Sequence, residues 1–320
     1  MSMDISPKSK PRVADAPPSN WVDRWAPISW QPYLRLGRFD RPVGTWLLLF
    51  PCWWSQTLAQ VSSGEPYPNV KYLLLFAIGA MAMRASGCAY NDFIDRDIDA
   101  RVKRTASRPI PSGEIRPDTA LKFVIVSALA GFAVLLNFNS FTIWLAISSL
   151  LIVATYPFAK RVTNYPQLVL GLAFNWGALV GWAAIKGSIG LPALALYAGC
   201  VLWTIGYDTI YAHQDKEDDA LLGLGSTALH FGERTVSFVG AMYGLAGICW
   251  LVAGALAGAH LVYFLSVILV FLQMSWQVST LDISDPANCL RRFRSNRDVG
   301  AAVFLGLLAD MALSWLAGLS

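Results

Sequence analysis

The chain has 320 residues, of which 55% are hydrophobic and only 14% charged, and its mean hydropathy is +0.45. Soluble domains carry about 25% charged residues, so this composition excludes an ordinary soluble protein and indicates a chain folded in lipid. The net charge of +4 is informative only through where Lys and Arg lie along the chain. The five cysteines show no CxxC spacing and the three histidines are dispersed, which argues against a disulfide framework and a zinc site.

Residues 1–27 are rich in proline and polar residues and contain no apolar core of signal-peptide length. We interpret this segment as a disordered tail. Its acidic residues Asp4 and Asp15 count against a mitochondrial presequence, so we expect the protein in a bacterial inner membrane. We expect residues 28–320 to form a single transmembrane domain.

Nine stretches are apolar over roughly the 20 residues that an α-helix needs to cross a bilayer. They cover residues 43–61, 71–90, 119–136, 140–157, 167–185, 192–211, 236–256, 260–279 and 299–318. We therefore predict an all-α, polytopic membrane protein with a bundle of nine transmembrane helices.

The distribution of basic residues gives this bundle an orientation. Nearly all of the 25 Lys and Arg residues fall on the side of the amino terminus. The other side holds only Lys71 and Lys186, and Arg84 and Lys122 lie inside predicted spans. The positive-inside rule makes the charged side cytoplasmic.

The first acidic motif follows the second predicted span and reads NDFIDRDID from Asn91 to Asp99. If the helix continues through it, Asn91, Asp95 and Asp99 lie at i, i+4 and i+8, with Asp92 beside them. Carboxylates at this spacing repel one another unless a cation offsets their charge. Oxygen ligands suit Mg²⁺, which binds one or two carboxylates together with phosphates and water. The motif therefore predicts a magnesium site at the cytoplasmic end of the span.

The second acidic motif follows the sixth predicted span and reads DTIYAHQDKEDD from Asp208 to Asp219. Asp208, Asp215 and Asp219 lie at i, i+7 and i+11, which would place them on one helical face. Both motifs end spans on the cytoplasmic side, so two facing helices could hold a diphosphate through bridging magnesium ions. The simpler interpretation, that both are solvated loop charges, accounts less well for two copies at the same membrane depth.

Basic residues near the two motifs supply the other half of an anion site. Arg104 and Arg108 follow the first motif, and Tyr156 and Lys160 lie in the next cytoplasmic connection. Guanidinium and ammonium groups beside acids suit a phosphate held between a metal and cations. The alternative is that these cations only orient the helices.

The segment before the first span, LRLGRFDRPVGTW, carries cations directly into an apolar stretch. Charge at that boundary costs free energy unless the side chain reaches the surface or meets a counter-ion. We expect Arg38 or Arg41 to hold the carboxylate of a small aromatic compound, and snorkelling is the alternative.

These elements together resemble the UbiA superfamily of intramembrane prenyltransferases. NDFIDRDID is similar to its NDxxDxxxD motif, DKEDD to its second DxxxD motif, and the stretch from Tyr156 to Lys160 to its YxxxK element. The similarity extends from about Tyr33 to the carboxyl end. LRLGRFDRPVGTWLLLFPCWW most resembles the branch that prenylates 4-hydroxybenzoate in ubiquinone synthesis.

The resemblance implies roles for individual residues. It implies Mg²⁺ ligands at Asn91, Asp95, Asp215 and Asp219, and diphosphate contacts from Arg104, Arg108, Tyr156 and Lys160. It places Arg38 near the acceptor's carboxylate, with Arg41 as the neighbouring candidate. We assign the acids of both motifs to the catalytic machinery: Asp92, Asp95, Asp99, Asp208, Asp215 and Asp219.

The implied reaction is Mg²⁺-dependent transfer of a polyprenyl group from its diphosphate to the ring carbon ortho to the hydroxyl of 4-hydroxybenzoate. The expected partners are these two substrates and the lipid bilayer, and no nucleic acid. Asp99 is one candidate for accepting the ring proton. Two alternatives stay open: a related enzyme with another aromatic or tetrapyrrole acceptor, and a secondary transporter, because intramembrane acids also mark ion pathways.

Overall fold

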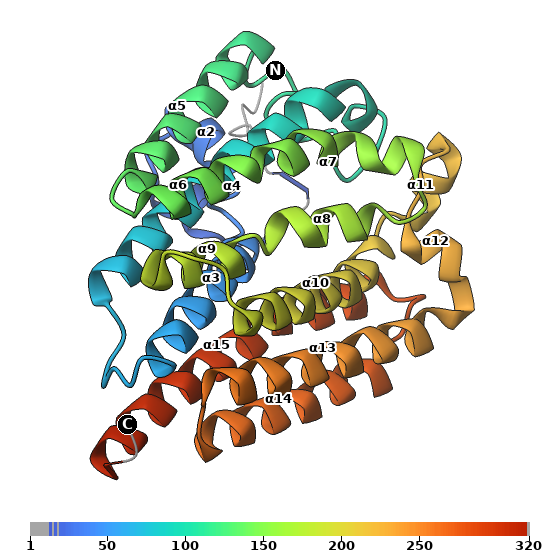
Figure 1. Cartoon of the computed structure of the whole chain (residues 1–320). Coiled ribbons are helices and arrows are strands. Elements are labelled where there is room, and N and C mark those ends of the chain that lie inside the picture. The colour runs from blue at the N-terminus through green and yellow to red at the C-terminus, as the bar shows by residue number, and fades with distance from the viewer. Residues whose placement is uncertain (1–12, 15, 18, 319–320) are drawn as a thin grey trace, which may run out of the picture. The chain divides into compact units, whose positions relative to one another are not determined.

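The computed structural model describes residues 13–14, 16–17 and 19–318, and these residues form helices and connections without a strand. Figure 1 shows the order of the helices along the chain. Their bounds are α1 Trp21–Trp25, α2 Gln31–Leu36, α3 Val43–Val61, α4 Val70–Asp99, α5 Pro117–Leu135, α6 Ser140–Ser148, α7 Leu150–Val162, α8 Pro166–Phe174, α9 Gly177–Lys186, α10 Leu191–Ala212, α11 Lys216–Leu222, α12 Thr227–Phe231, the 3₁₀-helix η1 Gly232–Arg234, α13 Thr235–Ala257, α14 Leu261–Ser279 and α15 Pro286–Leu316.

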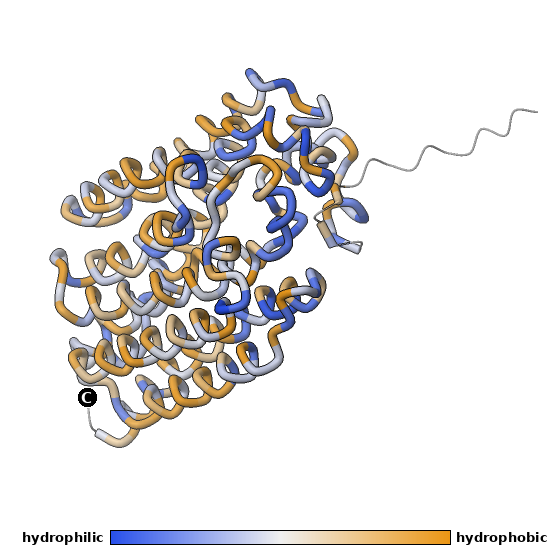
Figure 2. The backbone as a smooth tube through the Cα atoms, turned by 90° about the vertical axis from the view of Figure 1, so that its right-hand side faces the viewer, coloured by the Kyte–Doolittle hydropathy of each residue, from blue (hydrophilic) through white to orange (hydrophobic). Residues whose placement is uncertain are grey.

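The predicted all-α membrane architecture is confirmed. Within the described part of the chain, eight helical stretches are long and apolar enough to cross a membrane, and they coincide with eight of the predicted spans. The other predicted span is α3, which is long enough to cross but contains polar residues in its second half, including Ser55, Gln56 and Gln60. Figure 2 shows hydrophobic residues along most of the long helices and hydrophilic residues gathered in several connections and helix ends.

The contacts of the chain cluster in two compact units, residues 1–42 with 82–129 and residues 43–81 with 130–320. We call them unit 1 and unit 2. The proposal of a single domain over residues 28–320 stays a prediction. Much of the expected tail, residues 1–27, lies outside the described residues, but Trp21–Trp25 within it form α1, with the Asn20 side chain accepting a hydrogen bond from the Asp23 amide.

The core of unit 2 is built around three tryptophans. The rings of Trp54, Trp203 and Trp250 lie with centroids 5.2–5.7 Å apart and are fully buried. Glycine allows α10 to approach α13 closely, because a Cβ atom at Gly199 would lie 2.6 Å from the Trp250 ring. In Figure 1, α10, α13, α14 and α15 run side by side around this core.

Two of the predicted spans, 140–157 and 167–185, are interrupted. The stretch Ser140–Val162 breaks at Ser149 between α6 and α7, and Pro166–Lys186 breaks after Phe174 between α8 and α9. Side chains satisfy carbonyl groups near the second break: the Asn175 amide donates to the Gly171 carbonyl at 2.8 Å, and the Tyr197 hydroxyl to the Leu172 carbonyl at 2.9 Å. A broken helix persists within a membrane only where the protein replaces the lost hydrogen bonds in this way.

A buried acid in α15 caps the next helix in space. The carboxylate of Asp310 accepts hydrogen bonds from the His260 amide at 2.8 Å and the Tyr263 amide at 3.1 Å, at the start of α14. His260, the N-cap residue of α14, makes no capping bond of its own. Asp310 therefore satisfies backbone donors that would otherwise be buried without an acceptor.

We expect Asp310→Ala to lower the stability of the protein by about 1–3 kcal/mol, because two buried amides lose their acceptor. Thermal unfolding of the purified protein in detergent measures this effect. Asp285→Ala is the matched control, because Asp285 caps α15 through the Ala287 amide but its side chain is 43% exposed, so water can replace it. Equal losses in the two variants would contradict the capping role of Asp310.

Candidate functional site

The first acidic motif is helical, as predicted. α4 continues without interruption through Asp99, and the motif lies on its last turns. Asp92, Asp95 and Asp99 are buried, whereas the side chain of Asp97 is 82% exposed. One face of the helix therefore carries the acids inward, and the acid off that face points to the surroundings.

Two arginines neutralise part of this acidic face. The Arg38 Nη2 atom lies 2.6 and 2.8 Å from the two carboxylate oxygens of Asp92. Arg108 Nη1 donates to Asp92 Oδ1 at 3.2 Å and to Asp99 Oδ2 at 2.9 Å. All four side chains are buried, so these charge-assisted hydrogen bonds act in a medium of low dielectric constant. The structure thus brings together four predicted site residues from three segments of unit 1.

The backbone at Arg38 adopts a left-handed conformation, with φ of 61°, and it is the one non-glycine residue with positive φ in the described part of the chain. It closes α2 in a Schellman motif, in which the Phe39 amide donates to the Leu34 carbonyl and the Arg38 amide to the Arg35 carbonyl. Glycine would take this conformation at about 1 kcal/mol less cost. The bonds of the guanidinium to Asp92 offset that cost.

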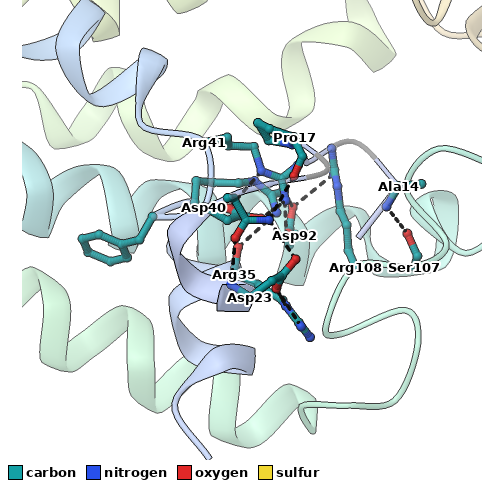
Figure 3. Close-up of polar contacts among 12 residues, drawn as sticks. Ala14, Pro17, Asp23, Arg35, Asp40, Arg41, Asp92, Ser107 and Arg108 are labelled. Atoms are coloured by element: carbon teal, nitrogen blue, oxygen red, sulfur yellow. Dashed lines mark hydrogen bonds and ion pairs between the residues drawn. The ribbon is translucent and has the colours of Figure 1, made fainter. Parts of the chain in front are cut away.

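Arg35 is a structural residue that the sequence analysis did not single out. It is 2% exposed, and its guanidinium donates to Asp23 at 2.9 and 3.1 Å (Figure 3). It also donates to Glu114 at 3.1 Å. It thereby ties α1 to α2 and to the connection before α5, one turn away from Arg38. Arg35 stands between Leu34 and Leu36 in the sequence, and an arginine buried among leucines requires counter-ions. This requirement was the one sign in the sequence that Arg35 forms ion pairs.

The remaining basic candidates of unit 1 have different surroundings. Arg41 pairs with its neighbour Asp40, with Arg41 Nη2 3.0 Å from Asp40 Oδ2, and Asp40 is buried. Arg104 lies in the connection between α4 and α5 and is partly exposed. The Thr105 hydroxyl in that connection donates to the Asp99 carbonyl at 2.8 Å and so fixes the path of the chain toward Arg108.

The expectation that the second motif forms one continuous helical face is wrong. α10 ends at Ala212, three residues follow, and Asp215 is the N-cap of the separate helix α11. Asp208 lies on the last turns of α10, and Asp219 on the first turn of α11. Three consecutive acids in that first turn favour a new helix start, because they interact with the positive end of its dipole. Counting residues across the break, as if the helix were continuous, therefore predicted the wrong helical face.

Contacts within unit 2 hold the interrupted segment in place. The Thr209 and Thr227 hydroxyls hydrogen-bond at 2.7 Å, and His213 Nε2 lies 3.1 Å from the Thr235 hydroxyl. Burial, together with the nearby Lys216 cation, lowers the pKa of His213 to about 4. His213 is therefore neutral at pH 7.

Tyr156 and Lys160 lie in one helix, although Lys160 falls beyond the predicted span 140–157. α7 runs through Val162 with Pro157 inside it, so the two residues sit at i and i+4 on one face. The Lys160 carbonyl accepts the Gly225 amide at 2.8 Å, and a Cβ atom at Gly225 would lie 2.2 Å from the Thr163 carbonyl oxygen. The end of α7 is thus packed against the segment that follows the second motif.

The residues that the structure describes do not form a closed metal cage. Among the described residues, no group of three or more His, Cys, Asp or Glu side chains is gathered so that it could hold a metal ion. Mg²⁺ does not require such a cage, because it usually binds one or two carboxylates and fills its remaining positions with phosphates and water. Arg38 and Arg108 engage Asp92 and Asp99. Of the other oxygen-bearing side chains in the motif, Asp97 is exposed, and Asn91 and Asp95 are ligands of the kind that Mg²⁺ prefers.

The sequence pattern of the UbiA prenyltransferase family matches residues 48–308. The chain thus combines a helical membrane bundle with an acidic motif, lined by arginines, at the end of a span. It also matches this family over most of its length. The chain belongs to the UbiA prenyltransferase family.

Individual relatives agree with this placement. The mitochondrial 4-hydroxybenzoate polyprenyltransferase of Rattus norvegicus is 48% identical over 288 residues, which cover 88% of this chain and 75% of the rat protein. The apo structure of a UbiA homolog from Aeropyrum pernix K1 is 27% identical, with a TM-score of 0.70 over 82% of this chain and 98% of that chain. A UbiA homolog from Archaeoglobus fulgidus bound to DMAPP and Mg²⁺ is 18% identical, with a TM-score of 0.64 over 88% of this chain and 99% of that one, and shares the fold.

The expectation of a bacterial inner membrane is contradicted by these comparisons. Relatives with 44–48% identity, from plant, mammal and slime mould, are named as mitochondrial proteins. Two acidic residues in a proline-rich segment were too little evidence for assigning a compartment. The multi-pass character of the protein is unaffected, because it rests on the spans.

Proposed function

We propose that the protein transfers a polyprenyl group from polyprenyl diphosphate to the ring carbon ortho to the hydroxyl of 4-hydroxybenzoate, as a step of ubiquinone synthesis. The observation that carries this proposal is the 44–48% identity, over about 90% of the chain, with proteins named 4-hydroxybenzoate polyprenyltransferase. The buried acidic face of α4 with its two arginines supports it, because a diphosphate site needs metal ligands and cations side by side.

In this proposal the two acidic motifs hold the diphosphate group through Mg²⁺. Asn91 and Asp95 of the first motif and Asp215 and Asp219 of the second are the metal ligands. Asp92 and Asp99 form ion pairs with Arg38 and Arg108. They hold the two guanidinium groups in position, and Asp208 extends the acidic region on α10.

The reaction requires the allylic carbon–oxygen bond to ionise while negative charge builds on the departing diphosphate. Bound Mg²⁺ supplies Lewis-acid stabilisation of that charge. Arg104, Arg108, Tyr156 and Lys160 donate hydrogen bonds to the diphosphate oxygens, and these bonds strengthen as the charge develops. Arg38, or Arg41 beside it, binds the carboxylate of 4-hydroxybenzoate and orients its ring for attack on the allylic carbon.

Loss of the ring proton then restores aromaticity. Asp99, which accepts a hydrogen bond from Arg108 at 2.9 Å, is a candidate acceptor of that proton. The apolar helices exclude water, which would otherwise convert the allylic cation to an alcohol. They also provide a lipid-like path for the polyprenyl tail.

Two other functions can be distinguished from this one by experiment. A relative with another aromatic or tetrapyrrole acceptor would keep the diphosphate site and change the acceptor contacts. A secondary transporter would use intramembrane acids without consuming a prenyl diphosphate. The family match favours an enzyme over a transporter.

The test is to supply membranes containing the protein with a polyprenyl diphosphate, 4-hydroxybenzoate and Mg²⁺, and to analyse products by mass spectrometry. We expect the ortho-prenylated acid, and none of it when a chelator removes Mg²⁺. Diphosphate consumption with another acceptor alone would reassign the substrate. Failure to consume prenyl diphosphate with any acceptor would reject the enzymatic function.

A further inference from the structure

The outer surface of α1 and α2 in unit 1 is aromatic. Trp25 is 78% exposed and Trp30 64%, and Trp21, Ile28 and Tyr33 are also exposed. We call these five residues the aromatic surface. An exposed cluster of large apolar side chains marks a surface that another phase or molecule covers.

Several polar side chains of the same segment point inward, whereas Arg24 is exposed. Arg35, Gln31 and Asn20 are buried, and Arg35 and Gln31 hydrogen-bond to each other at 3.2 Å. The Trp21 indole donates to the Phe39 carbonyl at 2.7 Å, so its outward ring is left purely apolar. A segment with charge inside and tryptophan outside is the reverse of a water-facing surface.

The depth of this surface follows from its contact with α5, a membrane-spanning helix. Arg116 and Asp118, at the start of α5, form an ion pair at 3.1 Å with side chains 82% and 55% exposed, which marks the aqueous end of the helix. The Tyr33 ring lies 6.3 Å from the Phe123 ring. Phe123 is six residues beyond Pro117, or about 9 Å further along the helix axis.

The helix surface beyond that contact is apolar. Ile125, Val126 and Leu129 of α5 are exposed, as expected of a helix that faces lipid. The aromatic surface therefore continues the lipid-facing surface of α5 at the level where headgroups meet acyl chains. Tryptophan and tyrosine are enriched at that level, because their rings are apolar while their polar atoms can reach water.

We propose that the aromatic surface lies in the headgroup–acyl boundary of the bilayer and anchors α1 and α2 there. The exposed Arg24 guanidinium lies 6.0 Å from the centre of the Trp25 ring and can meet a lipid phosphate at the same depth. Through Arg35 and the turn at Gly37, this anchor fixes the segment that presents Arg38 to Asp92. The proposal holds whatever substrates the enzyme uses.

The experiment places a nitroxide label at Trp25→Cys or Trp30→Cys in the full chain, with Cys88→Ala and Cys249→Ala removing the partly exposed thiols. The protein is reconstituted in lipid nanodiscs that hold one molecule each. Power saturation compares the label's accessibility to oxygen, which partitions into lipid, with its accessibility to a water-soluble nickel chelate. Ile125→Cys serves as the reference for lipid and Ser112→Cys, in an exposed connection of unit 1, as the reference for water.

We expect the oxygen-to-nickel ratio at positions 25 and 30 to be several-fold above that at position 112 and below that at position 125. A ratio equal to that at position 112 would place the surface in water and overturn the proposal. Shielding from both reagents would mean that protein covers the surface, and would also overturn it.

A second measurement keeps the native side chains. The fluorescence difference between the wild-type protein and Trp25→Phe isolates the emission of Trp25, and lipids brominated at different depths quench it. We expect strongest quenching by bromine nearest the headgroups. No quenching at any depth would contradict the membrane anchor even if the labelled variants failed to fold.

Discussion

Replacing Asp95 or Asp215 with asparagine should reduce turnover by about 100-fold or more, with little change in expression or membrane insertion. Each substitution keeps the shape of the side chain but removes a charge that we assign to Mg²⁺ binding. Removal of one electrostatic contact to a developing charge typically costs a factor of roughly 100 to 1,000 in rate. The measurement is the initial rate of prenyl transfer in membranes, at saturating concentrations of both substrates and Mg²⁺.

Two control variants remove a neighbouring charge without touching the proposed site. Asp97→Asn changes the exposed acid of α4, and Glu217→Gln changes an exposed acid in the first turn of α11. Both should retain turnover within a few-fold of wild type. If Asp97→Asn is as damaging as Asp95→Asn, the effect reflects the total charge of the motif, and the ligand assignment is wrong.

Arg38→Gly should raise the KM for 4-hydroxybenzoate by about 10- to 100-fold, which corresponds to losing a charge-assisted hydrogen bond of roughly 1.5–3 kcal/mol. The KM for the diphosphate substrate should change little. Glycine is the informative substitution, because it suits the left-handed backbone at position 38 and avoids added strain. Steady-state kinetics with each substrate varied in turn distinguishes the two effects.

The ion pair with Asp92 offers a second explanation for a higher KM in the Arg38→Gly variant. Removing Arg38 leaves Asp92 paired with Arg108 but without its second guanidinium partner. Breaking a buried pair by removing one partner is often costly in itself. The double variant Arg38→Gly with Asp92→Asn removes that imbalance. We expect it to leave the acceptor KM high; a return to the wild-type KM would show that Arg38 serves only to balance Asp92.

Hydrophobicity made the membrane fold predictable from the sequence. Apolar stretches of span length are a strong signal, and the helical period correctly placed Asp92, Asp95 and Asp99 on the buried face of α4. The signal worked there because the helix is uninterrupted. It failed between Asp208 and Asp219, where α10 ends and α11 begins, because helix ends depend on local capping that a periodic count ignores.

Pairing among buried charges was not predictable. Arg38 and Asp92 are 54 residues apart, and Arg35 and Glu114 are 79 apart, so no local pattern links them. The sequence showed that arginines entered an apolar segment and needed partners, but tertiary structure decided which acids they met. The interruption after Phe174 was not predictable for a similar reason, because Tyr197, from the separate helix α10, donates a hydrogen bond to the Leu172 carbonyl near it.

We propose that the two acidic motifs bind the same divalent ions together with a diphosphate. Binding of Mn²⁺ in place of Mg²⁺, followed by electron paramagnetic resonance of the full-length protein with a non-reactive diphosphate analogue, tests this without relying on activity. We expect tight binding only when the analogue is present, and its loss in Asp95→Asn and in Asp215→Asn alike. Wild-type Mn²⁺ binding in either single variant would contradict a shared site.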